Sequence, residues 1–400
     1  MEAAPLTLTP RRTQLGERLG VAHFDGWLLA AAFGLIGFSI FTLAVATPDA
    51  VPGQPLFYGV RQAAYAAVGV GLMLAISRVD YRRFREIRVG IYSLMIASIV
   101  LVLMFGAAAR GSRRWIELPF FRFQPSELAK LLLIVSLAAF VLDRSRRGSP
   151  MRQTVRILAL GLAPAALVFL QPDLGTGIVL GVITLTILFL AGVPWRHFAA
   201  IGGLAALAVS FMLVIAPAAG LPSPLHGYQQ DRLTAFLHPS NDPSDASYQV
   251  NQSVTAIGSG EKTGRGDNST QTKLLFVPER HTDFVFAVIG ERFGFAGAAL
   301  VLSLYALLIW RMLRVLTLSK NLYGTLIAGG IAAMLMFQIL VNVGMTLGVM
   351  PVTGVTLPLM SYGGSSVIAT FLAIGLLQSI HAQARLNSST RSRAPTPVLR

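Results

Sequence analysis

The hydrophobic residues of this chain fall into long runs that short polar segments separate. Most runs reach about 18 residues or more, the length that a helix needs to cross the hydrocarbon core of a bilayer. We therefore predict an all-α integral membrane protein with about ten spans. They cover residues 25–46, 57–77, 89–109, 126–142, 154–170, 174–192, 197–219, 284–310, 323–349 and 362–382. Only a turn at 171–173 separates the fifth and sixth runs, which could instead form one broken element.

Arginine residues collect in alternate connections between these runs. The N-terminal tail, the segments 78–88, 144–156 and 311–320, and the C-terminal tail are all basic. Because basic residues concentrate in the cytoplasmic loops of membrane proteins, these segments are expected on one, cytoplasmic, side. The prediction is one membrane domain at 25–385, with cytoplasmic tails at 1–24 and 386–400 and a long extracytoplasmic loop at 220–283 between the seventh and eighth spans.

The composition supports a membrane protein and narrows its chemistry. The chain is 54% hydrophobic and 13% charged, and its mean hydropathy is +0.63, whereas soluble proteins carry roughly a quarter charged residues. The net charge of +15 would suggest nucleic acid in a soluble protein, but here the cytoplasmic loops account for it. There is no cysteine, which excludes disulfides and thiolate chemistry. The first apolar run follows a polar N-terminus and is expected to stay as a span.

Two segments on the outer side break the charge pattern. Residues 110–124 carry four arginines, and the loop 220–283 contains Arg232 among apolar and aromatic residues. Arg61 stands near the outer end of the second span. Basic residues on this face suit an anionic ligand. The alternative is an ordinary solvated face that meets lipid headgroups, and Arg61 could equally extend to the interface.

The segment 276–290 brings a group of ionisable side chains up to an apolar run. It contains Glu279, Arg280, His281 and Asp283, and Asp283 is the last charge before the eighth span. Ionisable groups at a membrane boundary are costly to desolvate and usually have a function. Asp283 is therefore the best single candidate for a catalytic residue. Glu291 follows inside the span, with Arg292 or Arg61 as its expected partner.

Further polar groups stand at the ends of other spans. Glu127 and Lys130 share one face of the fourth span and can pair, either as a purely structural pair or as one that contacts a substrate. Asp173 can cap the sixth span. Residues 354–366 are predicted to be a re-entrant or unwound segment, which at membrane depth must be buried in protein or line a cavity. The histidines at 197, 226 and 238 lack metal-ligand spacing, so no metal site is expected from them.

Several of these segments, in this order, resemble the SEDS glycosyltransferases, the RodA/FtsW family of bacterial cell-wall synthesis. The matching segments are Arg114-Trp115, 123–130, 171–176, 248–260, 276–290, 342–345, 351–354 and 361–366. The forms Phe-Gln-Pro-Ser-Glu-Leu and Pro-Val-Thr-Gly are similar to the RodA, or elongation, branch. The chain departs from the family pattern at Glu261, Arg265 and Arg292. Arg292 stands where the family often has a second carboxylate after Glu291, so no role of that second carboxylate carries over.

The resemblance implies an enzyme of the bacterial cytoplasmic membrane that polymerises lipid II into glycan strands on the outer side during cell elongation. It also implies a class B penicillin-binding protein as partner. The family's essential carboxylate falls on Asp283, and its Glu and Lys fall on Glu127 and Lys130. The candidate substrate-contacting residues are Glu127, Lys130, Arg61, Arg114, Trp115, Arg232, His281, Glu291 and Ser365.

The chemistry expected from these residues is an inverting displacement. A sugar hydroxyl is too weak an acid to attack unaided, so Asp283 would take its proton as general base. Arg61, Arg114, Lys130 and Arg232 are candidates to stabilise the leaving diphosphate, and a divalent cation (Mg²⁺ or Mn²⁺) could share that work. His281 is the rival base, because it titrates near neutral pH.

Two other classes of function fit parts of the pattern. A flippase or secondary transporter also has many spans and intramembrane charges, but the chain shows no internal repeat, and its polar groups cluster toward the outer face. A non-enzymatic scaffold of the elongation machinery would tolerate changes at Asp283.

Overall fold

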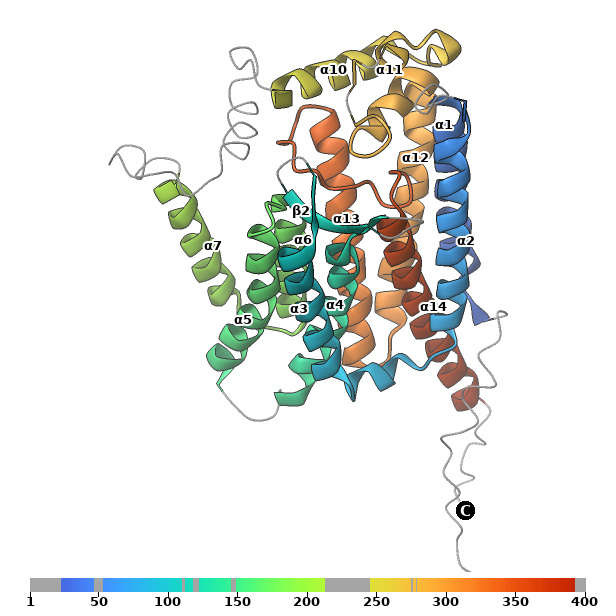
Figure 1. Cartoon of the computed structure of the whole chain (residues 1–400). Helices are drawn as coiled ribbons and strands as arrows, with labels where there is room; N and C mark the ends of the chain where they lie inside the picture. Colours follow the sequence, from blue (N-terminus) through green and yellow to red (C-terminus); the bar gives the residue numbers. More distant parts are fainter. Residues whose placement is uncertain are drawn as a thin grey trace, which may run out of the picture.

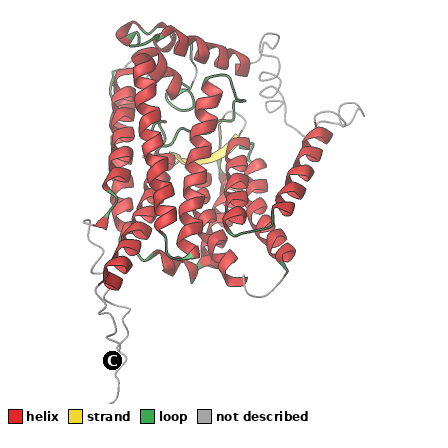
Figure 2. Cartoon of the chain, turned by 180° about the vertical axis from the view of Figure 1, so that it is seen from behind, coloured by secondary structure: helices red, strands yellow, loops and turns green. Residues whose placement is uncertain are grey.

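The computed structural model describes residues 23–46, 53–109, 112–117, 122–144, 149–212, 245–274, 276–277 and 279–392. These residues are nearly all helical, and the long helices run side by side in one bundle (Figures 1 and 2). The helices are α1 (Gly26–Ala46), α2 (Phe57–Ser77), η3 (Tyr81–Arg85), α3 (Arg88–Phe105), α4 (Pro125–Arg144), α5 (Pro150–Phe169), α6 (Leu174–Leu190), α7 (Trp195–Ser210), α10 (Asp245–Ser259), η5 (Gly266–Asn268), α11 (Thr270–Lys273), α12 (Val285–Leu318), α13 (Leu322–Thr346) and α14 (Gly364–Ser392).

A helix lies at the place of each of the ten predicted spans. Among the described residues, eight helices are long and apolar enough to cross a membrane: α1 to α5, α12, α13 and α14. Helix α6 has 17 residues and α7 has 16. An all-α multi-pass membrane protein is therefore confirmed, while the count of ten spans stays a prediction.

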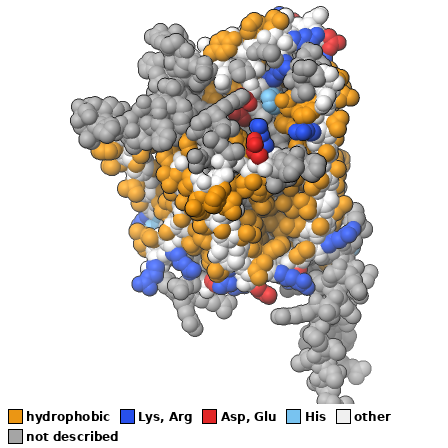
Figure 3. All heavy atoms as spheres, viewed as in Figure 1, with side chains coloured by type: hydrophobic (Ala, Val, Ile, Leu, Met, Phe, Trp, Pro, Cys, Tyr) orange, Lys and Arg blue, Asp and Glu red, His pale blue; other side chains and the backbone are white. Residues whose placement is uncertain are grey.

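The helices divide into a buried centre and an apolar periphery. Most of α4, α13 and the membrane part of α14 is buried, whereas less than a third of α3 and of α5 is buried. None of the residues of α7 is buried, and this helix stands apart at the edge of the bundle in Figure 1. Figure 3 shows the exposed surface as a broad hydrophobic band with basic side chains along its lower rim. Such a surface matches a bilayer core and its charged interface.

A buried ion pair ties three helices together at the lower end of the bundle. Arg311 of α12 donates to both carboxylate oxygens of Asp25, which precedes α1: Nε lies 3.1 Å from Oδ1, and Nη2 lies 2.5 Å from Oδ2. Gln378 of α14 accepts from the Asp25 backbone N–H at 2.8 Å. Both charges are less than a tenth exposed, so the bidentate geometry offsets the desolvation that each would otherwise suffer.

A short antiparallel sheet was not predicted. Helix α3 ends at Phe105 rather than at 109, and the chain continues as β1 (Ala107–Ala109), β2 (Ser112–Glu117) and β3 (Arg122–Phe123), in the order β1-β2-β3. The small sheet crosses the bundle below its upper end (Figure 1). Its polar residues pair backbone groups with one another before α4 begins, which satisfies donors and acceptors that an open loop would leave without partners.

The eighth predicted span, 284–310, is longer than predicted and is kinked. Helix α12 runs to Leu318, but Gly294 has φ +63° and interrupts its regular backbone. A Cβ at this position would lie 2.4 Å from the backbone nitrogen of Gly264. Glycine is therefore required both for the left-handed conformation and for the close approach of the loop that follows α10. Of the predicted outer loop, 245–274 contains α10 and α11 at the upper end of Figure 1, and 220–244 lies outside the described residues, as does 213–219 of the predicted seventh span.

Candidate functional site

Asp283 lies in a turn at the upper end of the bundle, immediately before α12. The backbone N–H groups of Thr282 and Phe284 both donate to the carbonyl of Glu279, at 3.0 and 3.3 Å. Glu279 has a positive φ of 52°, which closes the turn. The Phe284 side chain is buried, whereas Asp283 is half-buried. The turn thus holds a carboxylate at the upper surface of the packed helices.

The connection between α13 and α14 packs directly against this turn. The Ser361 hydroxyl donates to the carbonyl of Thr282 at 2.6 Å. The backbone N–H of Tyr362 donates to the carbonyl of His281 at 2.8 Å. Two successive residues of one segment therefore hold two successive residues of the other, on the N-terminal side of Asp283.

A buried amide completes the support. Asn342 of α13 donates from one Nδ2 to the carbonyl of Asp283 at 2.9 Å and to the carbonyl of Val355 at 2.8 Å. Asn342 is fully buried. A buried amide with satisfied donors fixes both carbonyls in a low-dielectric region. The backbone that carries Asp283 is consequently set before any ligand binds.

The same connection is anchored to α1 and α2. The hydroxyl of Ser39 donates to the carbonyl of Met360 at 2.7 Å, and Gln62 donates to the carbonyl of Ser361 and to Ser39 Oγ, each at 3.1 Å. Ser39 and Gln62 are fully buried. The predicted unwound stretch at 354–366 is therefore present up to Gly364, where α14 begins, and its carbonyls find side-chain partners, as irregular backbone at membrane depth requires.

Aromatic rings surround His281. Its ring stacks on Tyr58 with 4.7 Å between centroids and 26° between planes, and Tyr362 meets Tyr58 edge-on at 4.7 Å. Arg61, one turn after Tyr58, lies over the Phe57 ring at 4.3 Å and is exposed. His281 belongs to a turn and not to a helix. The cluster instead places an exposed cation and a flat aromatic surface on one side of the Asp283 turn.

The predicted pair between Glu127 and Lys130 is confirmed. Lys130 Nζ lies 2.7 Å from Glu127 Oε1, and the side chains are 4% and 8% exposed. Both belong to the first turns of α4, where the N-terminal end of the helix favours the carboxylate. Whether the pair contacts a substrate stays a prediction.

The predicted cap of α6 is also confirmed. Asp173 accepts from the backbone N–H of Thr176 at 3.2 Å and from its hydroxyl at 3.0 Å. Arg114 of β2 donates to the carbonyls of Gln171 and Pro172 and lies 3.9 Å from the Asp173 carboxylate. Arg114 therefore holds the tight turn between α5 and α6, which favours a positioning role over direct binding of a diphosphate. The neighbouring Trp115 is half-buried and pairs with Ala107 in the sheet.

Ser365 joins the beginnings of two helices. Its hydroxyl accepts from the backbone N–H of Gln124 at 2.8 Å and lies 3.3 Å from the carbonyl of Arg122. Earlier in the same connection, the backbone of Thr353 packs closely against Gly175 at the beginning of α6. A Cβ added at Gly175 would lie only 2.6 Å from the Thr353 carbonyl oxygen. The segment 353–365 therefore contacts the ends of α4 and α6 as well as the Asp283 turn. It connects the two groups of candidate residues that the sequence places far apart.

Glu291 has a different partner from the one expected. Its buried carboxylate accepts from the backbone N–H groups of Gln271 and Thr272, both at 2.8 Å, so it caps α11. Arg292 instead pairs with Asp267 at 2.5 Å. The prediction that Arg292 or Arg61 partners Glu291 is wrong, because backbone donors at the beginning of a short helix neutralise the carboxylate. Glu291 therefore fixes the loop that leads into the Asp283 turn.

One predicted site residue is not described by the structure, and three supporting residues were not predicted. Arg232 lies outside the described residues. Sequence reasoning gave no role to Asn342, Gln62 or Ser39, although a polar side chain within an apolar run was the available signal. Among the residues that the structure describes, no three His, Asp or Glu side chains come together as a metal site would require.

An apolar groove opens beside the turn that Arg114 holds. It has a volume of about 610 Å³ and lies between the end of α5 and the beginning of α6, where Leu170 and Leu174 flank the turn. Its walls are suited to a hydrocarbon chain. Near the upper end of the face in Figure 3, acidic, basic and histidine side chains gather above the hydrophobic band. An amphiphile with an anionic head and a long apolar tail fits this combination.

Comparisons with known proteins agree with this chemistry. Residues 24–386 match the model of the "Cell cycle protein" family FTSW_RODA_SPOVE. The chain is 36% identical over 369 residues to "Peptidoglycan glycosyltransferase MrdB" of Escherichia coli K12, covering 92% of this chain and 96% of that protein. A chain of a peptidoglycan synthase complex, solved to explain how polymerization and crosslinking are coordinated, superposes with a TM-score of 0.75 at 33% identity, covering 90% and 98% of the two chains. The Thermus thermophilus rod shape determining protein RodA superposes with a TM-score of 0.65 at 31% identity, covering 90% and 96%.

Proposed function

The chain belongs to the FtsW/RodA/SpoVE family of cell cycle proteins and is a peptidoglycan glycosyltransferase, and from this premise we propose that Asp283 is its general base. The substrate we propose is lipid II, a disaccharide-peptide linked through a diphosphate to a long isoprenoid. The role we propose is glycan polymerisation during cell elongation. The observation that carries the proposal is the fixed backbone of a half-buried carboxylate at the upper end of the bundle.

The base acts on the acceptor sugar. A sugar hydroxyl attacks the anomeric carbon of the donor while Asp283 accepts its proton, and the C–O bond to the diphosphate breaks on the opposite face. The product linkage is therefore inverted. A positioned base contributes about 10²- to 10⁴-fold to such a step. Asn342, Ser361 and the turn closed by Glu279 support this role, because they hold the backbone on both sides of Asp283.

The leaving diphosphate requires cations. We assign this role to Lys130, buried at the beginning of α4, and to the exposed Arg61 on α2. Fixed cations in a partly dehydrated site stabilise developing charge more than they would in water. Arg114 acts indirectly, since it holds the turn between α5 and α6. A Mg²⁺ or Mn²⁺ ion at this site would take ligands from the diphosphate and from single side chains such as Asp283.

The orientation follows from the two ends of the bundle. The basic segments at the lower end face the cytoplasm, and the Asp283 end faces outward, with both termini inside. The isoprenoid tail would lie in the groove between α5 and α6, with its diphosphate near the Arg114 turn. Because one similar structure is a complex that couples polymerization to crosslinking, we also propose a crosslinking class B penicillin-binding protein as partner.

The test is glycan polymerisation from lipid II by the purified protein together with its cognate transpeptidase. We expect Asp283→Asn to lower the rate by about 10²- to 10⁴-fold and His281→Ala to lower it by far less. A matched control is Glu261→Gln, because Glu261 is an exposed residue in the same region. If Asp283→Asn kept its activity while His281→Ala abolished it, His281 would be the base. If the wild-type protein made no polymer at all, a transport or scaffold function would replace the proposal.

A further inference from the structure

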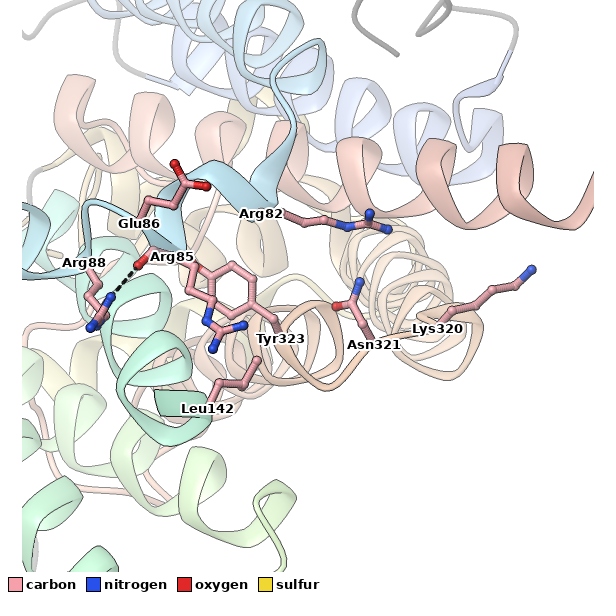
Figure 4. A pocket seen from close by; sticks show the side chains of 8 residues that line it. All are labelled: Arg82, Arg85, Glu86, Arg88, Leu142, Lys320, Asn321 and Tyr323. Atoms are coloured by element: carbon pink, nitrogen blue, oxygen red, sulfur yellow. Dashed lines mark hydrogen bonds between the residues drawn. The ribbon is translucent and has the colours of Figure 1, made fainter. Parts of the chain in front are cut away.

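A pocket lined by charged side chains lies at the lower end of the bundle, opposite the Asp283 turn. It has a volume of about 600 Å³ and opens among η3, the end of α4 and the beginning of α13. Figure 4 shows its lining side chains, which are Arg82, Arg85, Glu86, Arg88, Leu142, Lys320, Asn321 and Tyr323. None of these residues belongs to the proposed catalytic site, so the pocket needs an explanation of its own.

The lining is strongly cationic. It contains four basic side chains and one acidic side chain, that of Glu86. The nearby Asp143 lies 3.8 Å from Arg85 and also pairs with Arg88, which neutralises part of this charge. Arg82 and Lys320 are not part of these pairs with Asp143, so their positive charge adds to that of the pocket. In Figure 4 both side chains extend away from Glu86 and Arg88.

The beginning of α13 adds to the positive potential. Asn321 caps this 25-residue helix by accepting from the backbone N–H of Gly324 at 2.7 Å, and its Nδ2 donates to the Tyr81 hydroxyl at 2.7 Å. The N-terminal end of a long helix favours an anion. This potential adds to the guanidinium groups of η3 and the Lys320 ammonium group, which are the donors that a phosphate group requires.

The surroundings of the pocket are apolar and exposed. Ile87 and Val89 beside its arginines are 57% and 60% exposed, and Leu318 and Leu322 beside Lys320 are 40% and 43% exposed. Leu142 and Tyr323 form an apolar part of the wall. A soluble anion would gain nothing from these flanking residues, whereas the acyl chains of a lipid would cover them.

We propose that this pocket binds the phosphodiester headgroup of an anionic phospholipid. Its volume exceeds what a single phosphate fills and falls in the range of sites for whole small molecules, about 300–1,000 Å³. Basic pockets between helices at the cytoplasmic surface are suited to such headgroups. In the orientation proposed above, the lipid comes from the cytoplasmic leaflet. The site itself depends only on its own residues, so it stands or falls independently of the glycosyltransferase mechanism.

The test compares two double variants of the full-length protein. Arg82→Gln/Lys320→Gln removes the two lining cations that are not paired with Asp143. Arg83→Gln/Arg314→Gln removes two exposed arginines from the same end of the molecule that do not line the pocket, so it matches the change in net charge. Binding of phosphatidylglycerol and of phosphatidylcholine to each protein in neutral detergent is measured by native mass spectrometry. Inorganic pyrophosphate serves as the soluble anion.

We expect only the pocket variant to lose affinity for phosphatidylglycerol. Each basic residue near an anionic membrane surface strengthens binding by about fivefold, so the pocket variant should bind phosphatidylglycerol roughly 20- to 30-fold more weakly, while the control variant binds like the wild type. Phosphatidylcholine should bind weakly to all three proteins. Equal weakening in both variants would overturn the proposal, because net charge alone would then explain the binding. Equal affinity of the wild type for pyrophosphate and for phosphatidylglycerol would also overturn it, because the flanking apolar surface would then contribute nothing.

Discussion

The buried pair between Glu127 and Lys130 offers a direct way to separate structure from function. The two side chains are almost completely buried and lie 2.7 Å apart. Removing one partner leaves the other charge buried without compensation, which costs about 3–5 kcal/mol. We therefore expect both Glu127→Leu and Lys130→Met to lower the free energy of unfolding by about that amount.

The double variant should be more stable than either single one. Replacing a buried ion pair by apolar side chains is often neutral or stabilising. A loss of about 1 kcal/mol should remain, because Glu127 also interacts with the N-terminal end of α4. Unfolding of the detergent-solubilised proteins, followed by circular dichroism, would give the four values of the cycle. If the double variant lost the sum of the two single losses, the charges would not be coupled and the reasoning would be refuted.

Activity adds the second half of this prediction. A double variant that regains stability but makes no glycan would mean that the pair contacts the substrate, as expected for Lys130 beside the leaving diphosphate. A double variant that is both stable and active would restrict the pair to a structural role. The cycle thus decides a question that the sequence left open.

Three further predictions follow from the described contacts. Gly294→Ala should destabilise the protein by about 2 kcal/mol or more in thermal unfolding, because the positive φ at this position strains any other residue. Gly71→Ala is the control and should be neutral or stabilising, because a Cβ added there would meet open space. Equal effects of the two changes would contradict the packing described at the kink. Glu291→Gln should weaken the cap of α11 by about 1–3 kcal/mol and speed hydrogen exchange at 270–273, and unchanged exchange would contradict this role. His281→Ala should leave the pH dependence of the polymerisation rate unaltered, since Asp283 carries the proton. If the variant lost the acidic or alkaline limb of the pH–rate profile, that limb would belong to His281.

Local rules predicted much of the bundle. The spans depend on continuous apolar runs, and the cap at Asp173 and the pairing of Glu127 with Lys130 depend on residues within one turn of a helix. The sequence alone contains this information. The turn between α5 and α6 follows in the same way from Gln171-Pro-Asp173.

The remaining features depend on contacts between distant segments. The partner of Glu291 is the beginning of α11, a helix of four residues that no periodicity reveals. The sheet at 107–123 consists of strands too short to show an alternating pattern. The support of Asp283 by Asn342 requires α13 to pack beside the turn at 279–284. The sequence alone does not reveal this packing and shows Asn342 only as a single amide in an apolar run.

The measurement that tests the central claim most directly compares binding with chemistry in Asp283→Asn. Affinity for lipid II and the rate of glycan formation would be measured on the same preparation, with its transpeptidase present. If Asp283 is the general base, binding should change by no more than a few fold, while glycan formation falls by about 10²- to 10⁴-fold. Loss of binding in proportion to the loss of rate would mean that Asp283 holds the substrate instead, and an unchanged rate would remove it from the reaction altogether.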